Sequence, residues 1–591
     1  MSNQRKKDVG AIVHKSGVSF RVWAPFANSV AITGTFNNWQ LTALDSEGDG
    51  YWAVLIKGAK AGQEYKYVIM HGDQIVEKND PRALQLTTAA GNSVVVDPEF
   101  DWGTTTPQPI AQNQQVIYEM HVGTFNRLDP ATPGTFETAM AKLDYLKDLG
   151  VTTIELMPVG SMSMQREWWG YTPEYIYAVE NLYGGRHQML EFVKAAHERG
   201  MAVILDVVYN HFGPGEDLDL WQFDGWNENN KGGIYFYNDY RAMTPWGESR
   251  PDYGRPEVRQ YLLDNVRMWL HDFRLDGLRV DSTIFIRNLK GLNDDPAEDL
   301  PDGWSLMQKV TSVAHKINPQ ALMVAEDVGV NEYMCKQVNE GGAGFSAQWQ
   351  VDLPHAIRTA LNAARDEERD IRAIADQLQR RFNGDAFKRV VYSDSHDSAA
   401  NGAARLNEEA SPGNPVSMYA QEHALVAAGI VLTMPGMPML LQGEEFLQGG
   451  SFNDWQALEW ENANKLAGIV EAHKHLIALR KNQHSNTTGL MGQSIAILHQ
   501  NDEAKVLAYH RWDQGGAGDD VVVVINFASR SHAEYTVSFP HPGTWHVRFN
   551  SSWKGYSPDF KEIAVGDVVV ESNTGTLALP SSSILILSQD K

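Results

Sequence analysis

Four apolar segments in the middle of the chain end in charged or polar side chains. They cover residues 202–211, 277–281, 323–327 and 390–397, and each is typical of a short buried strand with a polar end. Carboxylates held close together can supply a nucleophile and a general acid. The polar ends are therefore the first candidates for chemistry: Asp206, Asn210, His211, Arg279, Asp281, Glu326, His396 and Asp397.

Each of these strand ends, taken singly, has a simpler explanation. An aspartate after a strand is most often the N-cap of the next helix, and a histidine beside it is most often structural. The combination is more informative, because four strand ends in order along the chain would deliver polar groups to one face. Arg279 and Asp281 also share one face of their strand, since side chains alternate with a period of two. The pattern favours one active site over four unrelated caps.

The elements that must position these residues alternate between strand and helix. Strands are predicted at 116–121, 153–157 and 202–208, and helices at 136–149, 189–199 and 257–273. Such alternation builds a parallel sheet, and no glycine-rich dinucleotide fingerprint is present. We therefore predict an α/β fold with a closed (β/α)8 TIM barrel, whose loops after the strands form the active-site face.

Short alternating segments flank the predicted barrel on both sides. Residues 18–23, 30–33 and 64–69 predict an N-terminal β-sandwich, residues 104–115 a linker, and residues 521–525 a strand of a second β-domain. A chain of 591 residues is long enough for several domains. We predict an N-terminal β-sandwich over 1–105, the barrel over 106–490 and a C-terminal all-β domain, a second sandwich, over 491–591.

Composition narrows the range of partners. The net charge of −24 argues against nucleic acid and against anionic membranes, which both attract basic surfaces, and it suits a neutral polymer. The uncharged stretch 424–441 contains Pro435 and Pro438, so we expect a buried helix, a turn and a buried strand there instead of a membrane span. The polar N-terminus predicts a cytoplasmic protein. Cys335, the single cysteine, forms no internal disulfide, and the oligomeric state is not predicted.

The same segments resemble the conserved regions of glycoside hydrolase family 13, the α-amylase family. The matching stretches are 206–211, 277–281, 325–327 and 395–397, and residues 20–25 and 34–39 resemble a family 48 carbohydrate-binding module. The resemblance covers most of the chain. It implies an enzyme that acts on α-glucans such as amylose, starch, glycogen and malto-oligosaccharides and that requires no cofactor.

The resemblance also implies a role for each carboxylate. Asp281 is expected to be the nucleophile of a retaining mechanism, and Glu326 its general acid and base. Asp397 is expected to hold sugar hydroxyls and to stabilise the transition state. Arg279 is expected to keep Asp281 ionised by its opposite charge.

Further side chains are expected to contact the substrate. His211 and His396 would donate hydrogen bonds to the glucose ring at the cleavage point. The ring of Tyr171 would stack on that sugar, with packing in the core as its alternative role. Trp169 and Asp206, together with Arg279, complete the predicted substrate-binding set.

Several segments along the chain resemble enzymes with one or the other of two activities. Residues 325–328, 334–335, 340–345, 393–397, 435–446, 451–455 and 458–460 resemble branching enzymes. Residues 118–125, 206–214 and 244–247 resemble malto-oligosyltrehalose trehalohydrolases, although branching enzymes share the first of these. The chain departs from branching enzymes after Asp281, where it reads Ser-Thr-Ile-Phe-Ile, and after Asp397, where no basic residue follows closely.

We predict a 1,4-α-glucan branching enzyme, with an α-1,4-glucan hydrolase of α-amylase or trehalohydrolase type as the alternative. The choice depends on whether a sugar hydroxyl or water attacks the glycosyl-enzyme. A catalytically silent glucan-binding protein is a third hypothesis. It is disfavoured because Asp281, Glu326 and Asp397 are all present in their motifs.

Two further expectations concern binding outside the active site. Trp23, Trp39 and Trp52 could grip glucan from the N-terminal domain, or could serve its core. The resemblance also allows a structural calcium ion near Asn210, whose other ligands the sequence does not identify, because calcium takes six or more oxygens from scattered positions.

Overall fold

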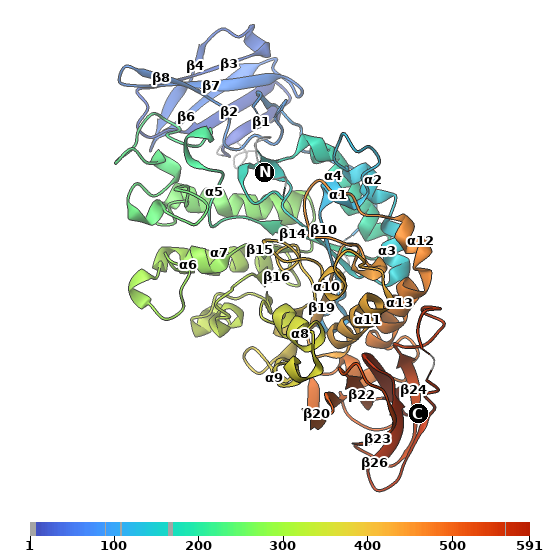
Figure 1. The fold of residues 1–591 in the computed structure, drawn as a ribbon. Helices are drawn as coiled ribbons and strands as arrows, with labels where there is room; N and C mark the ends of the chain where they lie inside the picture. Colours follow the sequence, from blue (N-terminus) through green and yellow to red (C-terminus); the bar gives the residue numbers. More distant parts are fainter. Residues whose placement is uncertain (1–7, 89, 107–108, 163–168, 562) are drawn as a thin grey trace.

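The computed structural model describes residues 8–88, 90–106, 109–162, 169–561 and 563–591. Figure 1 shows three domains along the molecule: a small β-domain carrying the N-terminal strands, a central α/β domain, and a second β-domain at the C-terminus. The central domain lies between the other two. The two β-domains are therefore at opposite ends of the molecule.

The N-terminal domain is a sandwich of two antiparallel sheets. One has the order β1-β2-β6-β5 and the other β4-β3-β7-β8, with β9 also on β7. In β2, Val18, Phe20 and Val22 alternate with the less buried Ser19 and Arg21, which is the period of a half-buried strand. The strands are β1 (Gly10–His14), β2 (Gly17–Trp23), β3 (Ser29–Gly34), β4 (Thr42–Ala43), β5 (Asp45–Gly48), β6 (Tyr51–Lys57), β7 (Glu64–His71), β8 (Gln74–Lys78) and β9 (Ser93–Val94).

This domain packs against the long loop that follows the third barrel strand. Trp23 is only 7% exposed and contacts Tyr235 edge-to-face, with 5.9 Å between ring centroids. Of the two roles left open for Trp23, the structure supports packing, because its ring serves the contact with the barrel. Trp52 is half-buried and donates its indole N–H to the Ala24 carbonyl. Of the three predicted candidates, Trp39 has the most open ring, at 44% exposed.

The central domain is a closed barrel of eight parallel strands. Their order is β10-β11-β14-β15-β16-β17-β18-β19, which confirms the predicted TIM barrel. The strands are β10 (Ile117–Met120), β11 (Thr153–Leu156), β14 (Ala202–Val207), β15 (Gly277–Val280), β16 (Leu322–Ala325), β17 (Ala347–Trp349), β18 (Arg389–Val391) and β19 (Met437–Leu441). All of their residues are buried. The strand β17 was not predicted, because three residues are too few to show a period.

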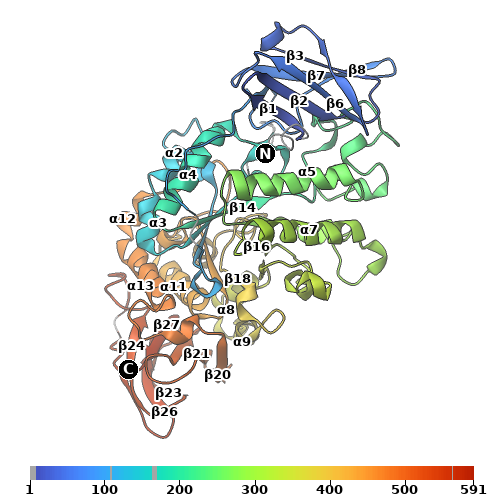
Figure 2. The same ribbon diagram turned by 180° about the vertical axis from the view of Figure 1, so that it is seen from behind.

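Helices surround the barrel, as Figure 2 shows from behind. The predicted helix at 136–149 is two short helices, and the one at 257–273 is α5 followed by a π-helical turn over Met268–Asp272. The helices are α1 (Val122–Phe125), α2 (Phe136–Met140), α3 (Leu143–Leu149), α4 (Gly185–Glu198), α5 (Pro256–Arg267), α6 (Thr283–Arg287), α7 (Pro301–Ile317), α8 (Leu353–Leu361), α9 (Ile371–Gln379), α10 (Leu406–Ala410), α11 (Met418–Thr433), α12 (Glu461–Lys465) and α13 (Ala467–Arg480). A small hairpin, β12 (Gly160–Met162) with β13 (Pro173–Val179), follows β11.

The uncharged stretch 424–441 forms the second half of α11, a turn and β19, as predicted. From Ala420 to Thr433 every residue of α11 is buried, because the helix lies between the barrel and the C-terminal domain. Within the described ranges, no helix has both the length and the hydropathy needed to cross a membrane.

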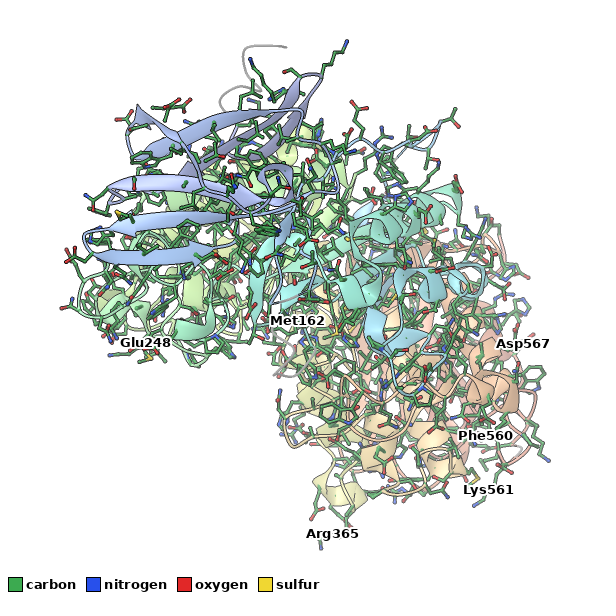
Figure 3. All side chains as sticks on the ribbon, turned by 90° about the horizontal axis from the view of Figure 1, so that it is seen from above. Met162, Glu248, Arg365, Phe560, Lys561 and Asp567 are labelled. Carbon is green, nitrogen blue, oxygen red and sulfur yellow. The ribbon has the colours of Figure 1, made fainter. Side chains whose placement is uncertain are left out.

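The C-terminal domain has a six-stranded sheet of order β20-β21-β22-β27-β24-β25 and a two-stranded sheet β23-β26. Arg511 of β21 is fully buried and donates to the carbonyls of Leu490, Gly492 and Thr433, the last of them in α11. Figure 3 shows Asp567 of this domain and Glu248 of the barrel on opposite sides of the molecule. The strands are β20 (Ser494–Asn501), β21 (Val506–Trp512), β22 (Val521–Asn526), β23 (His532–Ser538), β24 (Gly543–Asn550), β25 (Val568–Val570), β26 (Thr574–Leu579) and β27 (Ser583–Ser588).

Candidate active site

A cleft of about 810 Å³ lies at the carboxyl ends of the barrel strands. Its walls come from the loops after β11, β14, β15, β16 and β18. These loops are far apart along the chain. The cleft brings together the three predicted carboxylates and most of the predicted substrate-binding residues. It is lined by Trp169, Tyr171, Thr172, His211, Trp246, Asp281, Ser282, Phe285, Glu326, Val328, His396, Asp397 and Asn401.

One guanidinium links the carboxylates at the base of the cleft. Arg279 Nη1 lies 2.5 Å from Asp206 Oδ2 and 2.9 Å from Asp281 Oδ1, and Nη2 lies 3.1 Å from Glu326 Oε2. The Arg279 side chain is fully buried and its charge lies over the ring of Trp349, 4.3 Å from the centroid. Asp281 and Glu326 therefore stand side by side because each contacts a different nitrogen of one rigid group.

The backbone after Asp281 adds a second fixed contact. Ser282 has φ of 40°, in the left-handed region that only glycine adopts without strain, and its N–H donates to Glu326 Oε2 at 2.8 Å. This donor and Arg279 hold one Glu326 oxygen from two directions. The strained residue thus fixes the orientation of the Glu326 carboxyl relative to Asp281.

The charge state of Asp281 differs from the simple expectation. Burial and the neighbouring charge of Glu326 raise the pKa of Asp281 well above its usual range, and Arg279 only partly offsets them. The Arg279 charge lowers the pKa of Asp281 in the predicted direction, but burial and Glu326 outweigh it. A proton on Glu326 would remove this neighbouring negative charge, and Asp281 could then ionise beside Arg279.

His396 and Asp397 form the opposite wall of the cleft. His396 Nε2 lies 3.5 Å from Asp397 Oδ2, and the ring of Tyr171 stacks on the imidazole with centroids 4.9 Å apart. Burial disfavours charge on His396, but Asp397 and Glu119 outweigh burial and raise its pKa to about 9. The Asp397 side chain is 46% exposed, so its carboxylate faces the open part of the cleft.

His211 lines the third side, under an aromatic cap. The indole of Trp246 stacks on its imidazole with centroids 4.5 Å apart and 14° between the planes, and Phe285 meets the indole edge-to-face. Burial lowers the pKa of His211 to about 3. His211 is therefore neutral near pH 7 and offers one N–H donor and one acceptor, whereas His396 is a cation.

Asp206 and Arg279 lie behind the cleft wall, which differs from the direct substrate contact predicted for them. Asp206 is 3% exposed and accepts hydrogen bonds from Arg279 and from the Tyr171 hydroxyl, at 2.6 Å for the latter. Both residues reach the cleft only through other side chains. Trp169 does line the cleft, and its ring contacts Phe452 at 5.3 Å between centroids.

Asn210 is fully buried below the cleft, and neither atom of its side-chain amide has a hydrogen-bond partner among the described residues. An unsatisfied amide is suited to a water molecule or a cation. Over the same part of the chain, no group of three or more His, Cys, Asp or Glu side chains is arranged to hold a metal ion. Calcium also binds backbone carbonyls and water, which a search for acidic, histidine and cysteine side chains does not detect. The calcium site near Asn210 therefore stays a prediction.

Among the site residues that were missed from the sequence, two contact the predicted histidines. Glu119 of β10 hydrogen-bonds His396, and a charged residue inside a fully buried strand was a signal that could have identified it. Trp246 comes from the middle of the long loop after β14, far from any strand end. No pattern in the sequence could have placed its ring on His211.

Comparison with known families covers all three domains. Residues 119–231 and 219–485 match "Alpha amylase, catalytic domain", residues 497–590 match "Alpha amylase, C-terminal all-beta domain", and residues 8–83 match "Carbohydrate-binding module 48 (Isoamylase N-terminal domain)". The catalytic match spans more than half of the chain and contains Asp281, Glu326 and Asp397.

Individual relatives agree with these matches. The chain is 31% identical to malto-oligosyltrehalose trehalohydrolase from Saccharolobus solfataricus over 79% of each chain. It is 29% identical to a 1,4-alpha-glucan branching enzyme from Corynebacterium jeikeium, over 98% of this chain and 82% of the relative. The fold is similar to that of type I pullulanase from Bacillus subtilis, with a TM-score of 0.76 at 20% identity, covering 99% of this chain and 85% of the other. On this evidence the chain belongs to the α-amylase family, glycoside hydrolase family 13, and is an enzyme that acts on α-glucans.

Proposed function

We propose that this enzyme is a 1,4-α-glucan branching enzyme, which cleaves an α-1,4 link and transfers the released chain to a sugar 6-hydroxyl. The observation that carries the proposal is the extent of the likeness. Branching enzymes from several bacteria align over 91–98% of this chain, including both β-domains, whereas the trehalohydrolase aligns over 79%. Likeness along nearly the whole chain favours the activity of the relatives that show it.

In the proposed first half-reaction, Glu326 starts protonated and Asp281 starts ionised. Glu326 gives its proton to the glycosidic oxygen that leaves, and ionised Asp281 attacks C1 of the sugar to form a glycosyl ester. Arg279 contacts both carboxyls and stays in place as the negative charge moves from Asp281 to Glu326. The charge is therefore balanced by the same cation before and after the step.

In the second half-reaction Glu326, now a carboxylate, takes the proton of an acceptor 6-hydroxyl. The hydroxyl oxygen attacks C1, the ester bond to Asp281 breaks, and the α configuration is retained after two inversions. In this proposal the sugar that changes configuration lies between Asp397, His396 and His211. A carboxylate, an imidazolium and a neutral imidazole are suited to hydrogen bonds with its hydroxyls. If water replaces the acceptor, the same residues give hydrolysis.

Hydrolysis of the trehalohydrolase type is the second candidate, and one observation favours it. Trp246, from the segment that resembles trehalohydrolases, covers His211 and narrows the cleft beside Phe285. Phe285 itself lies in the stretch after Asp281 that departs from branching enzymes. An aromatic restriction here would limit the size of the acceptor.

Incubation with linear amylose, followed by proton NMR of the anomeric region, separates the two. The branching proposal predicts growth of α-1,6 signals with few new reducing ends. Growth of reducing ends without α-1,6 signals would overturn it in favour of hydrolysis. The Asp281→Asn protein, prepared in parallel, is the control for contaminating activity and is expected to give neither product.

A further inference from the structure

We propose that Glu119 is a positioning residue for glycosidic bond cleavage, which holds the His396 ring so that Nε2 faces Asp397 and the cleft. The inference rests on the proposed placement of the reacting sugar between these residues. It applies equally to transfer and to hydrolysis, because both need the first half-reaction.

The contact between Glu119 and His396 is made at two points. Glu119 Oε1 accepts a hydrogen bond from His396 Nδ1 at 2.5 Å, and Oε2 accepts one from the backbone N–H of His396 at 2.9 Å. The Glu119 side chain is 1% exposed, in a strand whose four residues are all buried. Such a two-point contact to a buried carboxylate fixes the backbone and the ring together.

The geometry determines which nitrogen of His396 can meet a substrate. Nδ1 carries a hydrogen, because its partner is a carboxylate, and it points away from the cleft into the barrel. Nε2 is left on the cleft side, 3.5 Å from Asp397 Oδ2. Tyr171 stacks on one face of the ring, and Trp169 meets the ring edge-to-face at 5.7 Å, so rotation is blocked.

The charge on His396 depends on the groups that face it from the surrounding elements. Asp397 and Glu119 favour the imidazolium, and Arg279 opposes it. Asp206 and Glu155 also interact electrostatically with His396 from β14 and β11. Loss of the Glu119 charge would remove one of the two main groups that hold the proton on His396. The pKa of His396 would then fall from about 9, and the cationic donor would be lost at lower pH.

A matched control lies on the neighbouring strand. Glu155 of β11 pairs in register with Glu119 of β10, and the two carboxyls are equally buried. Burial, followed by the Glu119 charge, raises the pKa of Glu155 well above its usual range, which favours its neutral form. Glutamine has almost the same shape as a protonated glutamate. Glu155→Gln therefore repeats the substitution in the same layer of the barrel, at a carboxyl whose charged form burial disfavours.

The test compares Glu119→Gln, Glu155→Gln and the wild type for the total rate of α-1,4 bond cleavage between pH 5 and 10. For Glu119→Gln we expect kcat to fall about 10²-fold, as for a misplaced catalytic group, with KM within about twofold. The pH at which the His396 imidazole titrates, followed by NMR, should fall by roughly one unit in Glu119→Gln and should keep its wild-type value in Glu155→Gln. An unchanged His396 titration in Glu119→Gln, or an equal shift in both variants, would overturn the proposal.

A second measurement does not depend on the folding of any Glu119 variant. In wild-type protein with ¹³C-labelled histidine, the His396 resonance, identified by its absence in His396→Gln, should titrate near pH 9. Titration near the ordinary value of about 6.5 would contradict a carboxylate-held imidazolium. The Glu119 test counts all cleaved α-1,4 links, whatever the acceptor. The branching proposal is tested separately, by the α-1,6 signals alone.

Discussion

Replacement of Arg279 by leucine tests the electrostatic core of the site. The substitution leaves Asp206, Asp281 and Glu326 in a buried layer without the cation that contacts all three. Removal of one partner of a buried ion pair costs about 3–5 kcal/mol, because the remaining charge stays buried and unpaired. We expect a loss in that range for the barrel at pH 8, in spite of the apolar gain from leucine.

The cost should depend on pH in a defined direction. Burial already raises the pKa values of Asp206 and Asp281, and loss of Arg279 would raise them further. An acidic group whose pKa is higher in the folded state than in the unfolded state destabilises the fold at pH values above its unfolded-state pKa. This destabilisation disappears as the pH falls below the unfolded-state pKa. The destabilisation by Arg279→Leu should therefore shrink as the pH is lowered from 8 to 5.

Arg480→Leu provides the control. Arg480 is equally buried but donates to the Met434 and Gly436 carbonyls, which do not titrate. Calorimetry or urea unfolding of the barrel transition at pH 5 and pH 8 measures both variants. The reasoning is refuted if Arg279→Leu costs less than about 1 kcal/mol at pH 8, or if its cost is as independent of pH as that of Arg480→Leu.

Three further variants test other parts of the account. Glu326→Gln should lose about 10³-fold or more of its activity on amylose but far less of the rate of fluoride release in the first turnover of α-maltosyl fluoride, because fluoride leaves without a proton. Equal losses in both measurements would exclude Glu326 as the acid. His211→Ala should lower kcat/KM about tenfold, the value of one hydrogen bond. Its pH profile should keep the wild-type shape between pH 5 and 8, since the pKa of His211 is about 3, and a changed limb in this range would show that His211 titrates there. Arg511→Met should lower the free energy of unfolding by about 2–4 kcal/mol, because buried carbonyls of Thr433, Leu490 and Gly492 lose their donor. An unchanged melting profile would show that Arg511 does not stabilise the domain contact.

The sequence was sufficient for the barrel and for the strand ends that bear the carboxylates. The period of two placed Arg279 and Asp281 on one face. β15 ends at Val280, and Asp281 directly after it still lies on the side of Arg279, since one Arg279 nitrogen contacts Asp281. Apolar runs followed by polar residues marked the cleft because a parallel barrel gathers all of its strand ends on one side. These features follow from local periodicity, which a single sequence displays.

The rest depends on register and on long loops. The contact between Asp206 and Arg279 requires these residues to be paired across β14 and β15, and no local pattern states that pairing. The break between α2 and α3 falls at residues 141–142, inside an amphipathic run that reads as continuous. The long loop after β14 supplies Trp246 and packs on the N-terminal domain through Tyr235, so tertiary contacts determine both positions.

The assignment of Asp281 as the nucleophile is the centre of the account, and direct capture of the intermediate tests it. Glu326→Gln incubated with α-maltosyl fluoride should form the glycosyl ester readily and resolve it slowly, because the second half-reaction lacks its general base. Peptide mass spectrometry should then find one maltosyl group on the peptide that carries Asp281, and none after Asp281→Asn is added to the same background. A maltosyl group on the peptide that carries Asp397, or turnover of the fluoride without any adduct when Asp281 is asparagine, would contradict the account.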